Sequence, residues 1–262
     1  MPNAKRQLAA GSFATAAVIV LAACGGGGDS GAPAAQQPQA VTKAEGVYEG
    51  TITGPEGNSA FDLLVLENNE LWGLGGDRIG GTLFVDGLIQ GQATAGDGTL
   101  STTNARVFDT DGAANVNLNA NFVANTSING TITAPGISLS FAGQRLVGTY
   151  DYNTPAELTS IVGNWNVTSL DGTPAALTIA QTGALNASAS GCVLTGSIVP
   201  RPSGKNVFNV SLTFGPAPCA LPGQTGTGVA VSAPVQGTAL RQLIIVGLNS
   251  DRTVGLALVG AR

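Results

Sequence analysis

The strictest pattern in this chain is the alternation of apolar residues with asparagine between Asn115 and Phe122. Successive side chains of an extended strand point to opposite faces, so Val116, Leu118, Ala120 and Phe122 would share one face. The intervening asparagines would lie on the other face. The pattern predicts a strand with one face in a core and one face in water, and it does not fit the 3.6-residue period of a helix.

The period of two recurs through most of the chain from Val47 onward, with turn signals between the alternating segments. These signals are Pro55–Asn58, Asn68–Asn69, Asp97–Gly98, Asp111–Gly112, Pro135–Gly136 and Asp171–Gly172. Short strands at intervals of about 8 to 12 residues, joined by such turns, predict an antiparallel meander and hence a sandwich or barrel.

In the second half of the chain, eight short strands follow one another without interruption. They are expected at 164–169, 175–181, 184–189, 192–199, 206–214, 227–233, 240–248 and 253–260. Eight strands in sequence suit a closed up-and-down barrel, which leaves no exposed edge. The first half gives a similar number between Val47 and Leu146. We therefore predict an all-β fold with two tandem small antiparallel up-and-down β-barrels of about eight strands each.

A membrane-spanning barrel does not fit these segments. Its strands run to about 9 to 11 residues and carry aromatic girdles at both interfaces. Most strands expected here are shorter, and aromatic residues make up 5% of the chain.

One helical pattern divides the two halves. Thr154, Pro155 and Glu157 match a helix N-cap, its first position and its N3 position, and Gly163 ends the turn. We expect a short helical linker at 151–163, between a first β-barrel-like domain at 45–150 and a second barrel domain at 164–262. Gly46-Val47-Tyr48 and Gly163-Asn164-Trp165 lie 117 residues apart and raise the hypothesis of an internal duplication.

Two of the expected strands, Phe61–Leu66 and Leu243–Val246, are apolar on both faces. The wall of a barrel has one face outside, so the outward residues of these strands need a cover. The hypothesis is that they form the contact between the two barrels.

The N-terminal segment resembles a bacterial lipoprotein signal. Lys5 and Arg6 precede an apolar run that ends in Leu21-Ala22-Ala23-Cys24, which matches the lipobox at all four positions. The resemblance implies a signal peptide at 1–23 and acylation of Cys24, such as palmitate. The Gly-, Ala-, Gln- and Pro-rich residues that follow predict a flexible lipid-anchored tether at 24–44. The run from Leu8 to Cys24 is short for a transmembrane helix.

Charge and composition exclude several partners and chemistries. After cleavage the chain would carry 9 basic and 16 acidic residues, a net charge of about −7, which argues against nucleic acid and against adsorption to anionic lipid. The chain has no histidine and 3 cysteines. With Cys24 acylated, Cys192 and Cys219 are expected to form a disulfide in an oxidising compartment, the alternative being two free thiols. We predict no metal site and no cofactor.

Several local patterns suggest chemistry, but each has a simpler explanation. Asp109–Gly112 resembles a calcium loop without the glutamate that such a loop requires, so a hairpin turn is preferred. Trp72–Gly76 lacks the lysine of a phosphate loop and suits glycines in a curved strand. Glu67 and Glu70 are expected to be solvated beside a turn. The asparagine row is either a recognition face for a glycan or protein, or the wet side of a strand.

Three families resemble parts of the chain. The Ile161–Trp165 run is similar to the Gly-x-Trp motif of lipocalin-type calycins, which implies that Trp165, with Tyr48 as its counterpart, packs on a barrel floor. The tether and the hairpin at Ser127–Ile132 resemble surface lipoproteins such as transferrin-binding protein B and factor H-binding protein. The segments around Cys192, Pro200–Val210 and Cys219 are similar to uncharacterised proteobacterial lipoproteins.

The preferred hypothesis is a lipid-anchored cell-envelope protein that serves as a binding or scaffold module without catalysis. Gly25 at the position after Cys24 implies the outer membrane by the lipoprotein sorting rule, facing the periplasm or the surface. The membrane, through the lipid on Cys24, would be one partner, and a protein or glycan partner is unidentified. The alternatives are a lipocalin-like carrier of a small apolar ligand and a periplasmic protease inhibitor that uses residues 34–44 as an arm.

Overall fold

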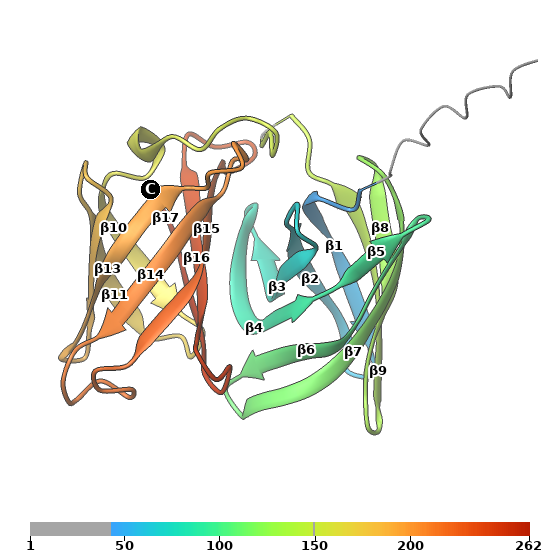
Figure 1. The fold of residues 1–262 in the computed structure, drawn as a ribbon, viewed down its shortest axis with the longest axis horizontal. Coiled ribbons are helices and arrows are strands. Elements are labelled where there is room, and N and C mark those ends of the chain that lie inside the picture. Colours follow the sequence, from blue (N-terminus) through green and yellow to red (C-terminus); the bar gives the residue numbers. More distant parts are fainter. Residues whose placement is uncertain (1–42, 149) are drawn as a thin grey trace, which may run out of the picture. The chain divides into compact units, whose positions relative to one another are not determined.

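The computed structural model describes residues 43–148 and 150–262. The lipobox, Cys24 and most of the expected tether therefore lie outside the described residues. All the described residues belong to one compact unit, and it consists of antiparallel strands with a single short 3-10 turn (Figure 1). No helix in the described ranges is long and apolar enough to cross a membrane.

The first nine strands form one barrel. Their order in the sheet is β4-β3-β2-β1-β9-β8-β7-β6-β5, and an additional pairing of β4 with β6 closes the ring. Eight strands make the wall, while the three-residue β5 pairs only with β6. The strands are β1 (Gly46–Gly54), β2 (Gly57–Val65), β3 (Glu70–Ile79), β4 (Thr82–Gln92), β5 (Thr94–Gly96), β6 (Thr99–Asp109), β7 (Gly112–Val123), β8 (Ser127–Ala134) and β9 (Ile137–Arg145).

The last eight strands form a second closed barrel in simple meander order, from β10 to β17 (Figure 1). Pairing of β10 with β17 closes it at Thr168–Val259 and Ser169–Leu258. The strands are β10 (Gly163–Ser169), β11 (Pro174–Ile179), β12 (Ala184–Ala189), β13 (Cys192–Pro200), β14 (Phe208–Phe214), β15 (Thr225–Pro234), β16 (Arg241–Asn249) and β17 (Gly255–Ala261). The predicted fold class, with two eight-stranded up-and-down barrels, is confirmed.

Each barrel buries the apolar half of its alternating pattern. In β7 the apolar residues from Val116 to Phe122 are buried, and the asparagines between them are exposed. Leu118 and Phe122 join Tyr48 and Phe61 in the core of the first barrel. The core of the second barrel includes Trp165, Leu177, Ile198, Phe208 and Leu243. The asparagine row is thus the wet side of a strand.

A third apolar cluster joins the two barrels through their outer faces. Leu64 and Leu66 of the first barrel share this cluster with Val246 of the second, and Ile244 packs against it. The inward residues of the same strands, such as Leu63 and Leu243, belong to the separate barrel cores. The hypothesis that the strands with two apolar faces form the contact between the barrels is confirmed.

The predicted linker at 151–163 does contain a helical element, but this element begins later than the start predicted at Thr154-Pro155. The structure has only a 3-10 turn at Leu158–Ser160 (η1), with Glu157 at the N-cap position and no side-chain cap. The Thr154 hydroxyl instead donates to the Asp151 carbonyl oxygen. Ile161 is fully buried and Leu158 packs against the core of the second barrel.

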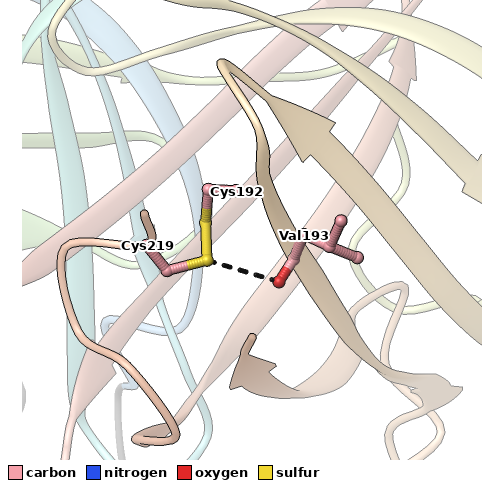
Figure 2. Close-up of a disulfide and its surroundings, with 3 residues drawn as sticks. All are labelled: Cys192, Val193 and Cys219. Atoms are coloured by element: carbon pink, nitrogen blue, oxygen red, sulfur yellow. Dashed lines mark hydrogen bonds between the residues drawn. A yellow bond between two sulfur atoms is a disulfide. The ribbon is translucent and has the colours of Figure 1, made fainter. Parts of the chain in front are cut away.

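The predicted disulfide between Cys192 and Cys219 is confirmed (Figure 2). Cys192 begins β13, and Cys219 lies in the connection between β14 and β15, 27 residues later. The dashed line in Figure 2 joins the sulfur of Cys219 to the carbonyl oxygen of Val193, 3.5 Å away. A sulfur in a disulfide carries no proton, so this is a packing contact. The bridge ties the long β14–β15 connection to the wall of the second barrel.

Candidate functional site: a cleft between the barrels

Tyr48 and Trp165 are the two aromatic residues predicted to pack on a barrel floor. Tyr48 lies inside the first barrel. It is fully buried, and its hydroxyl donates a hydrogen bond to the Ala44 carbonyl oxygen at 2.8 Å. The Arg145 guanidinium lies 5.8 Å from the centre of its ring. Arg145 also donates to the carbonyl oxygen of Glu45. Burial raises the pKa of the Tyr48 hydroxyl, although the Arg145 charge opposes this shift.

Trp165 has matching surroundings in the second barrel. It is buried, and its Nε1 donates to the Ile161 carbonyl oxygen at 2.7 Å. The Arg262 guanidinium lies 4.0 Å from the centre of the ring and donates to the Val162 carbonyl oxygen at 2.6 Å. The geometry suits a cation–π contact.

All of these positions correspond at one offset of 117 residues, from Ala44 and Ile161 through to Arg145 and Arg262. The glycines Gly46 and Gly163 correspond at the same offset of 117 residues. Gly46 and Gly163 both have a positive φ, of 144° and 119°, and a Cβ at either would lie within 3 Å of the guanidinium of Arg145 or Arg262. Glycine is required there because of both the backbone and the arginine. This repetition supports the hypothesis of an internal duplication.

The interiors of the barrels leave little room for a ligand. The core of the second barrel consists of buried apolar side chains, among them Trp165, Phe208 and Leu243. The first barrel retains a cavity of about 210 Å³, lined mainly by apolar residues that include Ile52, Phe61, Ile89, Leu118 and Phe141. This is smaller than most ligand pockets, which range from about 300 to 1,000 Å³.

A larger cavity, of about 420 Å³, lies between the outer faces of the two barrels. Strands β1, β2, β3 and β9 supply one side, and β15 and β16 supply the other. Its lining is predominantly apolar, with a few charged and amide groups. This composition and volume are typical of small-molecule sites. We refer to this cavity as the cleft.

The side of the cleft formed by the first barrel consists of two adjoining cross-strand rows. Pairing places Val47, Leu64 and Trp72 in one row, which is apolar. The next row contains Gln144, Glu49 and Asp62, and it ends in the apolar Leu74, which pairs with Asp62. Directly opposed residues in a sheet have Cβ atoms about 5 Å apart, so each row is a continuous strip. The cleft therefore has an apolar strip beside a polar one.

Arg78 links the two carboxylates of the polar row. Its guanidinium contacts the Asp62 carboxylate closely and lies 3.9 Å from Glu49 Oε2. Burial raises the pKa of the Asp62 carboxyl, and the neighbouring Arg78 charge opposes this shift. Glycine at position 76, where β3 shifts register against β4, lets the strand bend before Arg78. The glycine-rich Trp72–Gly76 segment is thus a curved strand, as predicted.

The other side of the cleft is almost entirely apolar. Val229 pairs with Val246, and Val231 pairs with Ile244, on β15 and β16. Gln242 is buried, and its amide donates to the Leu83 carbonyl oxygen of the first barrel at 3.4 Å. This bond joins the two barrels beside the cleft.

A separate polar cluster holds the barrels together beside the linker. Arg201 donates to the Glu67 carboxylate at 2.7 Å, and the Tyr152 hydroxyl donates to it at 3.2 Å. Lys205 pairs with Glu45 at 3.0 Å. Burial is the largest single influence and alone would raise the pKa of the Glu67 carboxyl, but the hydrogen bonds to the carboxylate and the charge of Arg201 together lower this pKa.

The expectation of a solvated Glu67 and Glu70 is therefore wrong. Glu67 binds across the contact between the barrels, because Arg201 of the second barrel approaches it. Glu70 accepts hydrogen bonds from Trp72 Nε1 at 3.0 Å and from the Gln90 amide at 3.3 Å. The Asp109–Gly112 segment is a hairpin turn, as predicted, in which the Asp109 carboxylate accepts from two backbone amides.

The described residues contain no group of three or more His, Cys, Asp or Glu side chains that could hold a metal ion. Sequence reasoning did not find the cleft residues Glu49, Thr51 and Arg78. One signal pointed to the site, since Asp62 is the single charged residue in the otherwise apolar Phe61–Leu66 segment. The outer face of this strand is covered by the second barrel. A charged residue on that face therefore indicates a polar site within the contact between the barrels.

Comparison with known proteins gives little further information. No protein-family model matches the chain, and no curated protein matches it. A solved structure with similarity is that of a protein of unknown function from the DUF3598 family of Nostoc punctiforme. It is 18% identical, with 84% of this chain and 96% of that chain covered, and the TM-score is 0.28. At so low a TM-score, no property of that protein is transferred to this chain.

Proposed function

We propose that this protein is a non-catalytic binding module of the cell envelope that holds a small amphipathic molecule in the cleft between its barrels. The observation that supports this proposal is the cleft itself, with a volume of about 420 Å³ and an apolar strip beside a polar one. The volume lies within the usual range of ligand sites. An amphipathic ligand would match both strips at once.

The calycin-type alternative, a carrier with its ligand inside a barrel, has less support. The second barrel has a core of buried apolar side chains, and the cavity of about 210 Å³ in the first barrel is half the size of the cleft. The protease-inhibitor alternative depends on residues 34–44, most of which lie outside the described residues. We propose no catalytic step, because the Asp62 carboxylate in the cleft is already paired with Arg78.

Attachment to the envelope is part of the proposal and rests on the lipobox Leu21-Ala22-Ala23-Cys24. Acylation of Cys24 would anchor the barrels to the outer membrane. Replacement of Cys24 by serine removes the thiol that accepts the lipid. We expect the Cys24→Ser protein to move almost entirely from the membrane to the soluble fraction, with its far-UV circular dichroism unchanged. Persistence of Cys24→Ser in washed membranes would contradict the lipid anchor.

Obstruction of the cleft tests the binding proposal. Thr51 is an exposed residue of β1 that lines the cleft, so the Thr51→Trp side chain would occupy part of its volume. With octanol as the probe, calorimetry on the full chain should give a Kd below about 1 mM, equivalent to about −4 kcal/mol. Thr51→Trp should weaken this binding at least about tenfold.

Thr53→Trp is the matched control. Thr53 is exposed on the same strand two residues further along, so its side chain has the same orientation, but it does not line the cleft. We expect Thr53→Trp to bind octanol as the unmodified chain does. Equal losses in the two variants, or no binding of octanol to the unmodified chain, would contradict the proposal.

A further inference from the structure

The polarity of the cleft changes along its length. Val47, Glu49 and Thr51 are successive outward residues of β1, and positions two residues apart on a strand are separated by about 7 Å. Strand pairing places Leu64 and then Trp72 beside Val47, so this end is apolar. Glu49 pairs with Asp62 and Gln144, and the Arg78 guanidinium lies 3.9 Å from its carboxylate. A ligand that follows β1 would therefore have an apolar body and a polar head.

The charge of Arg78 is already neutralised within the cleft. Its Nη2 contacts the Asp62 carboxylate closely, and its Nη1 lies 3.4 Å from the Gly81 carbonyl oxygen. The side chains of Arg78 and Asp62 are only 27% and 19% exposed. Two partly buried groups in direct contact form a charge-assisted pair. A ligand head would have to break this pair in order to use either group.

Glu49 is different, because its carboxylate is available. Its side chain is 41% exposed, and the nearest cation, Arg78, is 3.9 Å away. Within residues 43–148 and 150–262, no side chain or backbone group donates a hydrogen bond to it. The charged residues that line the cleft are Glu49, Asp62 and Arg78, so carboxylates outnumber cations by two to one. The charged lining of the cleft is thus net negative, and Glu49 carries the more exposed of the two carboxylates, with only the distant contact to Arg78.

We propose that the ligand of the cleft is a cationic amphiphile, with an alkyl or aryl body on the apolar strip and an amine head bound to Glu49. This inference rests on the proposed function and adds the charge of the ligand. An ammonium group would donate hydrogen bonds to the Glu49 carboxylate and neutralise it. An anionic head would meet the exposed Glu49 carboxylate in a cleft of net negative charge, so its binding would be disfavoured by repulsion. A ligand with a neutral head would bind with an affinity between those of the cationic and the anionic ligands.

Octylammonium, octanol and octanoate share one body and differ in the charge of the head, so they test this proposal directly. Calorimetric titration of the full chain at neutral pH should show octylammonium binding at least about tenfold more tightly than octanol, a difference of about 1.4 kcal/mol. Octanoate should bind most weakly. The preference for octylammonium should decrease at high salt, because the Glu49 carboxylate is partly exposed to solvent.

Glu49→Gln removes the charge while it keeps the size of the side chain. In this variant we expect octylammonium to bind within about threefold of octanol, with octanol binding unchanged. Glu56→Gln is the matched control, because Glu56 is exposed in the β1–β2 turn and does not line the cleft. Glu56→Gln should keep the full preference for octylammonium.

The outcomes separate this inference from the function on which it rests. Equal binding of all three probes would overturn the cationic ligand and leave the cleft as a binding site. Tightest binding of octanoate would also overturn it and would assign the head group to Arg78. A preference for octylammonium that survives Glu49→Gln would overturn the role of Glu49. Absence of binding by every probe would overturn both the inference and the proposed function.

Discussion

Replacement of Trp165 by alanine is expected to destabilise the second barrel by about 4 to 5 kcal/mol. Removal of a buried aromatic side chain costs about 3 to 5 kcal/mol, because the cavity left behind does not fully collapse. Trp165 is 2% exposed and belongs to the core of the second barrel. The variant also loses the hydrogen bond to Ile161 and the contact with the Arg262 guanidinium. A loss of this size is a large part of the stability of a typical domain.

Urea unfolding followed by far-UV circular dichroism measures this loss. Trp165→Phe is the matched variant, because it keeps an aromatic ring and removes the donor to the Ile161 carbonyl oxygen. It should cost only about 1 to 2 kcal/mol. Equal free energies of unfolding for Trp165→Ala and Trp165→Phe would contradict a packing role for the aromatic ring in the core of the second barrel.

Removal of the disulfide is expected to cost about 3 to 4 kcal/mol. The bridge between Cys192 and Cys219 spans 27 positions, and a loop of this length restricts the unfolded chain by about that amount. The double variant Cys192→Ala/Cys219→Ala should therefore unfold at a clearly lower urea concentration. Cys219 is 4% exposed, so a small loss of packing accompanies its replacement.

Reduction provides the control for the disulfide. Dithiothreitol should lower the stability of the unmodified chain to nearly that of the double variant, and it should leave the double variant unchanged. A difference below about 1 kcal/mol between the unmodified chain and the double variant would show that the bridge does not stabilise the second barrel.

The sequence predicted the barrels well because their signals are local. Turn residues such as Asp111-Gly112 and Asp171-Gly172 end the strands, and the alternation from Val116 to Phe122 determines which face is buried. The strands of the second barrel were predicted to within about two residues. The disulfide followed from the small number of cysteines. The Phe61–Leu66 and Leu243–Val246 segments, which are apolar on both faces of the strand, also indicated where the barrels meet.

Features that depend on how the barrels meet were not predictable from local patterns. Thr154-Pro155 has the sequence of a helix start, but the helical turn begins only at Leu158, and Ile161 directly after it is buried in the core of the second barrel. The sequence around Glu67 is that of a solvated turn. Its partner Arg201 lies 134 residues later in the chain, so local sequence does not reveal the pair. The cleft is formed by side chains of both barrels, so no single segment reveals it.

The fluorescence of Trp72 tests the binding site most directly. The chain has two tryptophans, of which Trp72 lines the cleft and Trp165 lies in the core of the second barrel. In the Trp165→Phe variant, titration with octylammonium should change the emission of Trp72. The Kd fitted to this change should equal the Kd measured by calorimetry. In the Trp72→Phe variant, the emission of Trp165 should stay constant. Binding heat with no change at Trp72, or a saturable change at Trp165, would contradict the location of the ligand in the cleft.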